Sequence, residues 1–266
     1  MTRSLNNNQT ELLKLLYNFR FATSTLITER LKPKHRESIN SRLNILHKYG
    51  LIGKHYDKSY KIDRRPAVYF LLSDAFKWLR QDEDVSESML KRIYNDRKAS
   101  DSFIDHSLQI FAIANKLESI YDGKLDYFTS SELAEGYDHF PQPLPDGFVS
   151  YQKTQRSKPK NFFLHTVSSN KPFFVAARKL DAYIAYAKSD KWSREAEKLL
   201  SVLFVCDNDS LEKRLQKHAL RIEDDRPSYL RFYTTKSEQL MEADRHNDCI
   251  WLLLASESSR RLPIDI

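Results

Sequence analysis

The sequence predicts an α+β protein in which three helices and a β-hairpin precede an α/β domain with a mixed sheet. Three observations predict this fold. Apolar residues recur at helical spacing up to residue 49, two β-rich runs then flank a basic loop, and short β-rich runs alternate with amphipathic helices from residue 101 onward. We therefore expect an N-terminal domain, a connector and a C-terminal domain over residues 1–80, 81–100 and 101–266.

The composition excludes several classes of protein. The five glycines of the 266 residues cannot build a dinucleotide-binding fingerprint or a P-loop. The longest apolar run, Ile250–Ala255, is too short to span a membrane, and the N-terminus has no apolar signal core. Two cysteines indicate a reducing compartment. We therefore expect a soluble cytoplasmic protein.

Apolar stripes predict the first three helices. The first runs from Asn8 to Phe19, the second lies between a capping Thr23 or Ser24 and Pro33, and the third covers about 36–49. Gly50 follows the third helix, where a left-handed C-cap favours glycine.

The hairpin is expected from β-rich residues over 51–56 and 67–72, which flank the basic stretch 57–66. Three helices followed by a hairpin is the order of a winged helix, a helix–turn–helix variant whose third helix enters the major groove. The charge is placed as this fold requires, because residues 30–65 hold 11 basic and 3 acidic residues within a chain of net charge +7. The first domain is therefore predicted to bind double-stranded DNA.

A helical wheel of the third helix places Ile39, Leu43 and Leu46 inward. Polar and basic residues of its other face and of the hairpin tip are the candidate DNA contacts, since Ser and Asn can read base edges and Lys and Arg neutralise phosphates. These candidates are Arg36, Ser38, Ser41, Arg42, Asn44, Lys48, Lys58, Tyr60, Lys61, Arg64 and Arg65.

The C-terminal domain is expected to begin with a long helix over Asp101–Tyr121. Residues 130–146, with three prolines, are expected to form a loop. The expected strands cover 125–129, 148–151, 162–167, 202–206, 230–233 and 250–254, and the expected helices cover 173–187 and 211–220. This alternation predicts a mixed sheet covered by helices.

Four features of the chain carry a resemblance to a known family. They are the winged helix, the helix HSLQIFAIANKLESI that contains His106, the pair Pro145-Asp146, and NFFLHTV followed by RKLDAYIAY. Over about residues 8–190 the chain resembles the replication-relaxation family of plasmid, phage and integrative-element proteins. The resemblance implies that the winged helix is joined to a domain similar to the PD-(D/E)XK nuclease core.

That nuclease core holds Mg²⁺ between an Asp and a second carboxylate, and a nearby Lys assists the attacking water. Asp146 stands at the family's Asp position, but His165 occupies the second acidic position, and a neutral imidazole is a poor ligand for Mg²⁺. We therefore expect no enzymatic activity, no metal and no cofactor. If the site is active instead, Asp146, His165 and Lys179 are the residues expected to form it.

The expected function is that of a DNA-binding protein of a mobile element, either a transcriptional regulator or an accessory factor in replication or mobilisation. Since one winged helix reads only a short half-site, a homodimer formed by the second domain is expected, and a replication or mobilisation protein is a further possible partner. Two alternatives stay open: a metal-dependent nuclease with a migrated active site, and a protein-interaction module that does not bind DNA.

Overall fold

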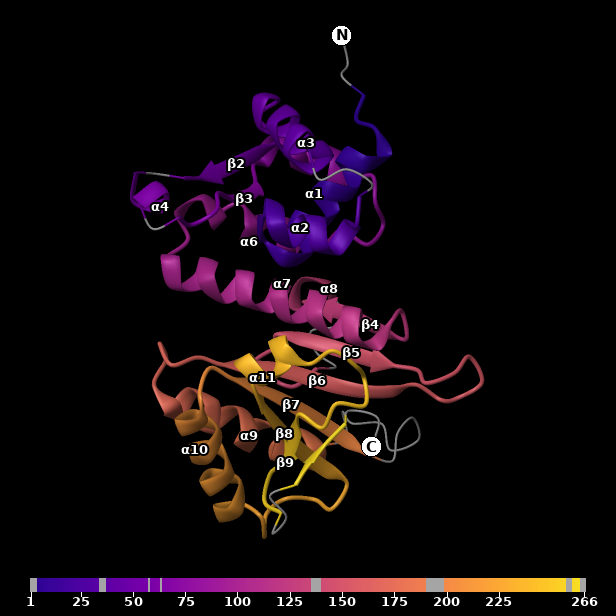
Figure 1. Cartoon of the computed structure of the whole chain (residues 1–266), viewed down its shortest axis with the longest axis vertical. Helices are drawn as coiled ribbons and strands as arrows, with labels where there is room; N and C mark the ends of the chain where they lie inside the picture. Colours follow the sequence, from indigo (N-terminus) through magenta and orange to yellow (C-terminus); the bar gives the residue numbers. More distant parts are fainter. Residues whose placement is uncertain are drawn as a thin grey trace. The chain divides into compact units, whose positions relative to one another are not determined.

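The computed structural model describes residues 4–33, 37–56, 58–62, 64–134, 140–189, 199–256 and 260–263. The chain divides into two compact units, Met1–Asn115 and Lys116–Ile266, with the division inside helix α7 (Asp101–Tyr121). The prediction of an α+β protein is confirmed. The first unit holds a three-stranded antiparallel sheet and the second a seven-stranded mixed sheet (Figure 1).

Three helices open the first unit close to their predicted bounds. They are α1 (Asn7–Phe19), α2 (Ser24–Leu31) and α3 (Glu37–Lys48). Asn6 caps α1 in a capping box with Gln9, and Thr23 caps α2 by accepting a hydrogen bond from the Leu26 N–H. Gly50 has φ +70°, the left-handed conformation predicted for the residue after α3.

The predicted hairpin is present as β2 (Ile52–His55) paired antiparallel with β3 (Val68–Leu71). A strand that was not predicted, β1 (Phe21–Thr23), pairs with the other edge of β3 and makes the sheet order β1-β3-β2. The stretch between β2 and β3 also differs from the predicted loop, because it contains the short helix α4 (Lys58–Ile62).

The rest of the first unit consists of short helices and the first part of α7. The short helices are η1 (Ser73–Ala75), α5 (Phe76–Leu79), α6 (Glu87–Ile93) and η2 (Asp96–Lys98). Residues 81–100, expected as a connector, pack onto the first unit: Asp96 is 2% exposed and accepts a hydrogen bond from Arg20 Nε at 2.8 Å.

The second unit contains every strand that the sequence predicts, within a few residues, and adds β10 at the edge of the sheet. The strands are β4 (Leu125–Thr129), β5 (Gly147–Tyr151), β6 (Lys160–Val167), β7 (Leu200–Cys206), β8 (Leu230–Lys236), β9 (Trp251–Leu253) and β10 (Arg261–Leu262). Their order is β10-β9-β8-β7-β6-β5-β4, parallel between β6 and β8 and antiparallel elsewhere.

Two long helices connect the parallel strands. Helix α9 (Phe173–Lys188) joins β6 to β7, and α10 (Asp209–Arg221) joins β7 to β8. The two helices contact each other and lie side by side (Figure 1). All seven residues of β7 are buried, which suits a central parallel strand covered on both faces.

Two short helices complete the second unit. Helix α8 (Ser130–Leu133) lies at the start of the predicted loop 130–146, and α11 (Ser237–Glu242) follows β8. No helix in the described part of the chain is long and apolar enough to cross a membrane.

Candidate functional site

Helix α3 has one buried face and one exposed face, as its sequence pattern predicts. Ile39, Leu43 and Leu46 are fully buried. The residues on the other side are the candidate DNA contacts: Ser41, Asn44 and Lys48 are exposed, and Ser38 and Arg42 are half-buried. The exposed face of α3 therefore presents short polar side chains beside cationic ones.

The connection between β2 and β3 presents a second group of cations. Lys61 and Arg64 are exposed, and Arg65 forms an ion pair with Asp105 of α7 at 2.7 Å. The Arg65 guanidinium also lies 4.9 Å from the centre of the Tyr60 ring. Arg65 is therefore engaged within the first unit.

Tyr60 is the candidate residue that differs most from expectation. The sequence places it among the cations of an exposed hairpin tip, but its side chain is only 9% exposed. It packs in a cluster with Phe21, Val68, Phe70 and Ile104. Because the ring fills this cluster, Tyr60 anchors α4 against the sheet rather than projecting from it. Of the remaining candidates, Lys58 lies in α4 and Arg36 lies outside the described residues.

The second candidate site brings together Asp146, His165 and Lys179 from three separate segments of the second unit. Asp146 directly precedes β5, His165 lies in β6 and Lys179 lies in α9. Antiparallel pairing sets Gly147 opposite Leu164, so the preceding and following residues, Asp146 and His165, meet at the end of the ladder. The register of β5 and β6 thus brings together residues that the sequence analysis named for the case of an active nuclease site.

The carboxylate of Asp146 is the centre of this constellation. Its Oδ2 accepts hydrogen bonds from the Thr166 N–H at 2.7 Å and the Thr166 hydroxyl at 3.1 Å. Lys179 Nζ lies 3.5 Å from the same oxygen, and His165 Nδ1 lies 3.8 Å from it. The Asp146 and Lys179 side chains are 14% and 13% exposed, so the pair lies just below the surface.

The imidazole of His165 is fully buried next to this carboxylate. Its Nε2 lies 3.0 Å from the hydroxyl of Tyr183, and its ring stacks on Phe204. Burial raises the pKa of Tyr183 well above its usual value, and the negative charge of Asp146 raises it further. The Tyr183 hydroxyl therefore keeps its proton and can donate it in a hydrogen bond to His165.

Sequence reasoning named three members of this group and missed Thr166 and Tyr183. The position of Tyr183 was open to prediction, because Lys179 and Tyr183 are four residues apart on α9 and so share one face of the helix. Thr166 had no such signal, since its hydrogen bonds to Asp146 depend on how β5 and β6 pair.

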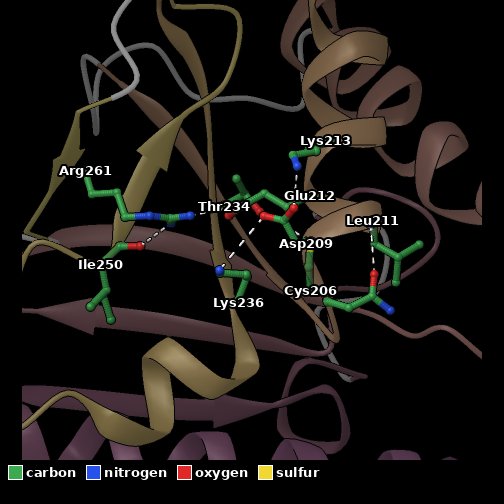
Figure 2. Close-up of polar contacts among 10 residues, drawn as sticks. Cys206, Asp209, Leu211, Glu212, Lys213, Thr234, Lys236, Ile250 and Arg261 are labelled. Carbon is green, nitrogen blue, oxygen red and sulfur yellow. Dashed lines mark hydrogen bonds and ion pairs between the residues drawn. The ribbon is translucent and has the colours of Figure 1, made fainter.

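A third polar cluster lies where α10, β8 and β10 meet (Figure 2). Arg261 donates to Glu212 Oε2 at 2.6 Å and to the carbonyl of Ile250 at 2.8 Å. The Glu212 side chain is 5% exposed, and its Oε1 is buried without a hydrogen-bond partner among the described residues. Nearby, the Cys206 thiol lies 3.3 Å from the Thr234 hydroxyl, and burial raises the pKa of Cys206 to about 12. We assign this cluster to packing, because it ties β10 to α10.

Comparison with known proteins places the chain in a family. A family model described as replication-relaxation matches residues 13–202, which is most of the chain and includes parts of both units. The chain belongs to the replication-relaxation family. Membership indicates a role in the replication or relaxation of plasmids or other mobile elements. No curated protein and no solved structure gives a significant match.

The nuclease-like core that the replication-relaxation resemblance implies would hold Mg²⁺ at Asp146. The residues there do not fit that ion. Mg²⁺ prefers several oxygen ligands in octahedral geometry, but Asp146 is the single carboxylate of the group, and its Oδ2 already accepts from Thr166 and faces Lys179. Among the described residues there is no group of three His, Cys, Asp or Glu side chains arranged to hold a metal. We therefore derive no metal-dependent step at this site.

Proposed function

We propose that this member of the replication-relaxation family is a DNA-binding factor of a mobile element and that its first unit is a winged helix. The observation that carries this proposal is the exposed face of α3, where Ser41, Asn44 and Lys48 lie opposite a fully buried apolar face. The order α1, β1, α2, α3, β2, β3 and the antiparallel β2–β3 pairing support the winged-helix assignment.

The charges of the first unit support duplex DNA as its partner. An α-helix fits the major groove, where Asn can pair with adenine and Ser with either base of a pair. Lys48, at the end of α3, and Lys61 and Arg64, between β2 and β3, are exposed cations of the kind that neutralise phosphates. In this proposal the helix reads sequence and the β2–β3 connection holds the backbone.

We further propose that the protein binds DNA as a homodimer and acts at an origin or promoter of the element. A single recognition helix covers a short half-site, whereas a dimer reads two half-sites about one helical turn apart. Sedimentation analysis of the protein alone and on DNA tests this part. A monomer in both states would exclude the dimer while leaving DNA binding intact.

The test of DNA binding is a salt series with duplex DNA, carried out on the wild type and single variants. Lys48→Gln and Arg64→Gln should weaken binding to every sequence and lower the salt slope by about one each. Asn44→Ala should cost about 1–3 kcal/mol on a selected site and little on random DNA. Lys91→Gln, an exposed cation of α6, is the matched control and should have no effect.

Two other outcomes would replace this proposal. A nuclease is the second candidate, because Asp146, His165 and Lys179 converge in the second unit even though they offer Mg²⁺ a single carboxylate. Cleavage that requires Mg²⁺ and is abolished by Asp146→Ala would establish it. A chain that shows no affinity for DNA beyond weak, variant-insensitive binding would instead be a protein-interaction module.

A further inference from the structure

The hairpin that joins β5 to β6 carries a concentrated positive charge. Residues 116–266 contain 23 Lys or Arg and 23 Asp or Glu, so the second unit as a whole is neutral. Residues 147–180, however, hold seven Lys or Arg and no acidic residue. Four of those cations, Lys153, Arg156, Lys158 and Lys160, are exposed on the hairpin. Its charge therefore differs sharply from that of the unit that carries it.

The turn of this hairpin is held by its own hydrogen bonds. The Thr154 N–H donates to Ser157 Oγ at 3.0 Å, and the Ser157 hydroxyl and N–H donate to the Thr154 carbonyl at 2.8 and 2.9 Å. The Gln152 side-chain amide donates to the Ser157 carbonyl at 2.8 Å. Lys153, Arg156 and Lys158 thus lie in a connection whose backbone is held by its own hydrogen bonds, which reduces the backbone entropy lost when a ligand binds there.

The composition of the tip identifies the class of ligand. Residues 152–160 read QKTQRSKPK and offer amides, hydroxyls and cations, with no aromatic or large aliphatic side chain. Protein interfaces depend on such apolar anchors at their centre. Phosphate contacts are made instead by Arg, Lys, Ser, Thr and Gln, all of which the tip contains. A nucleic-acid backbone fits this surface better than an acidic protein does.

We propose that the β5–β6 hairpin of the second unit is a second DNA-binding element, which contacts the phosphate backbone of duplex DNA. The backbone is the expected contact, because phosphate oxygens accept hydrogen bonds from Arg, Lys, Ser, Thr and Gln, and four cations are concentrated in QKTQRSKPK. This inference rests on the proposed function, and it gives the second unit a direct part in DNA binding.

The test is the salt dependence of binding for two matched double variants of the full chain. Arg156→Gln with Lys158→Gln removes two exposed cations from the hairpin, and Lys217→Gln with Arg221→Gln removes two exposed cations from α10. In the hairpin variant the slope of log affinity against log salt concentration should be smaller in magnitude by about two. Raising the salt from 50 to 200 mM should therefore weaken DNA binding by a factor about ten times smaller in this variant than in the wild type. The α10 variant should keep the wild-type slope.

The possible results separate this inference from the proposed function. If Arg64→Gln weakens binding while the hairpin variant retains the full wild-type slope, the hairpin proposal is overturned and the winged helix stands. If the hairpin variant lowers the salt slope and the Lys48→Gln and Arg64→Gln variants do not, the hairpin is the DNA contact, and the proposal that the first unit binds DNA as a winged helix is wrong. Equal loss in the hairpin and α10 variants would indicate a non-specific charge effect and would also overturn the inference. Circular dichroism melting of each variant confirms that it is folded.

Discussion

Replacing Arg261 by leucine takes away the guanidinium that pairs with the buried carboxylate of Glu212 in the second unit. Arg261 donates to Glu212 Oε2 at 2.6 Å, and the other oxygen is already buried without a partner among the described residues. The variant would thus leave a carboxylate that is 5% exposed without the guanidinium that now pairs with it. The same change frees the carbonyl of Ile250, which Arg261 also holds.

The size of the effect follows from this geometry. At 2.6 Å and an effective dielectric constant near 20, the Coulomb attraction is about 6 kcal/mol, of which desolvation of the two ions offsets a part. Breaking a buried pair by removing one partner costs about 3–5 kcal/mol. That is a large fraction of the 5–15 kcal/mol, roughly, that stabilises a domain. We expect the second unit of Arg261→Leu to be folded but weakly stable.

Urea unfolding followed by tryptophan fluorescence measures this loss. Trp251 is fully buried on β9 beside β10, and the other two tryptophans of the sequence, Trp78 and Trp192, are replaced by Phe so that Trp251 alone reports unfolding. With a slope of about 2 kcal/mol per molar urea, the midpoint should fall by about 2 M. The double variant with Glu212→Leu should regain most of the stability, because no buried charge remains. A midpoint unchanged in the single variant would refute the reasoning.

Three further predictions concern single side chains. Gly53→Ala should destabilise the first unit by about 1–3 kcal/mol in thermal unfolding, because a Cβ there would overlap the buried Phe70 ring. Lys14→Gln should raise the pKa of Asp82, which the hydrogen bond from Lys14 now lowers, and NMR titration of the carboxyl measures it. A lowered pKa stabilises the fold fully above the unfolded value of about 4. The stability difference from wild type should therefore shrink as the pH falls below that value and vanish once the pH is below the lowered pKa of the folded protein. Tyr183→Phe should cost about 1–3 kcal/mol in urea unfolding by leaving a buried imidazole without its hydroxyl, and a change below about 0.3 kcal/mol would contradict this.

Long periodic elements were predictable from the sequence. The bounds of α7 and β4 agree with the predicted Asp101–Tyr121 and Leu125–Thr129, because hydrophobic spacing and the flanking polar residues mark them. The short elements β1 and α4 gave no such pattern. β1 has three residues and forms only because β3 offers an edge, and α4 is fixed by the burial of Tyr60 inside a charged stretch.

Contacts between distant residues explain what else the sequence could not supply. Asp96 lies in the polar segment that the sequence predicts to be a connector. In the structure Asp96 is buried and accepts a hydrogen bond from Arg20, which stands 76 residues earlier in the chain. The candidate cluster of Asp146, His165 and Lys179 was named from the sequence, but whether its members meet depended on the register of β5 and β6. Charge and residue type can be read from a sequence, whereas pairing partners follow from the tertiary fold.

The ion pair between Arg65 and Asp105 has a consequence for how the first unit meets an anion. The carboxylate of Asp105 pairs with the Arg65 guanidinium in the way that a phosphate would. An anion from solution must therefore displace a carboxylate that belongs to the same chain and stays close to Arg65. Binding at Arg65 is then an exchange of one anion for another, with little net release of salt ions, unlike binding at the exposed Arg64. Arg64 and Arg65 carry the same formal charge but differ in how they can bind an anion. Arg64 is exposed and can bind one directly, whereas Arg65 binds one only after the carboxylate of Asp105 has been displaced.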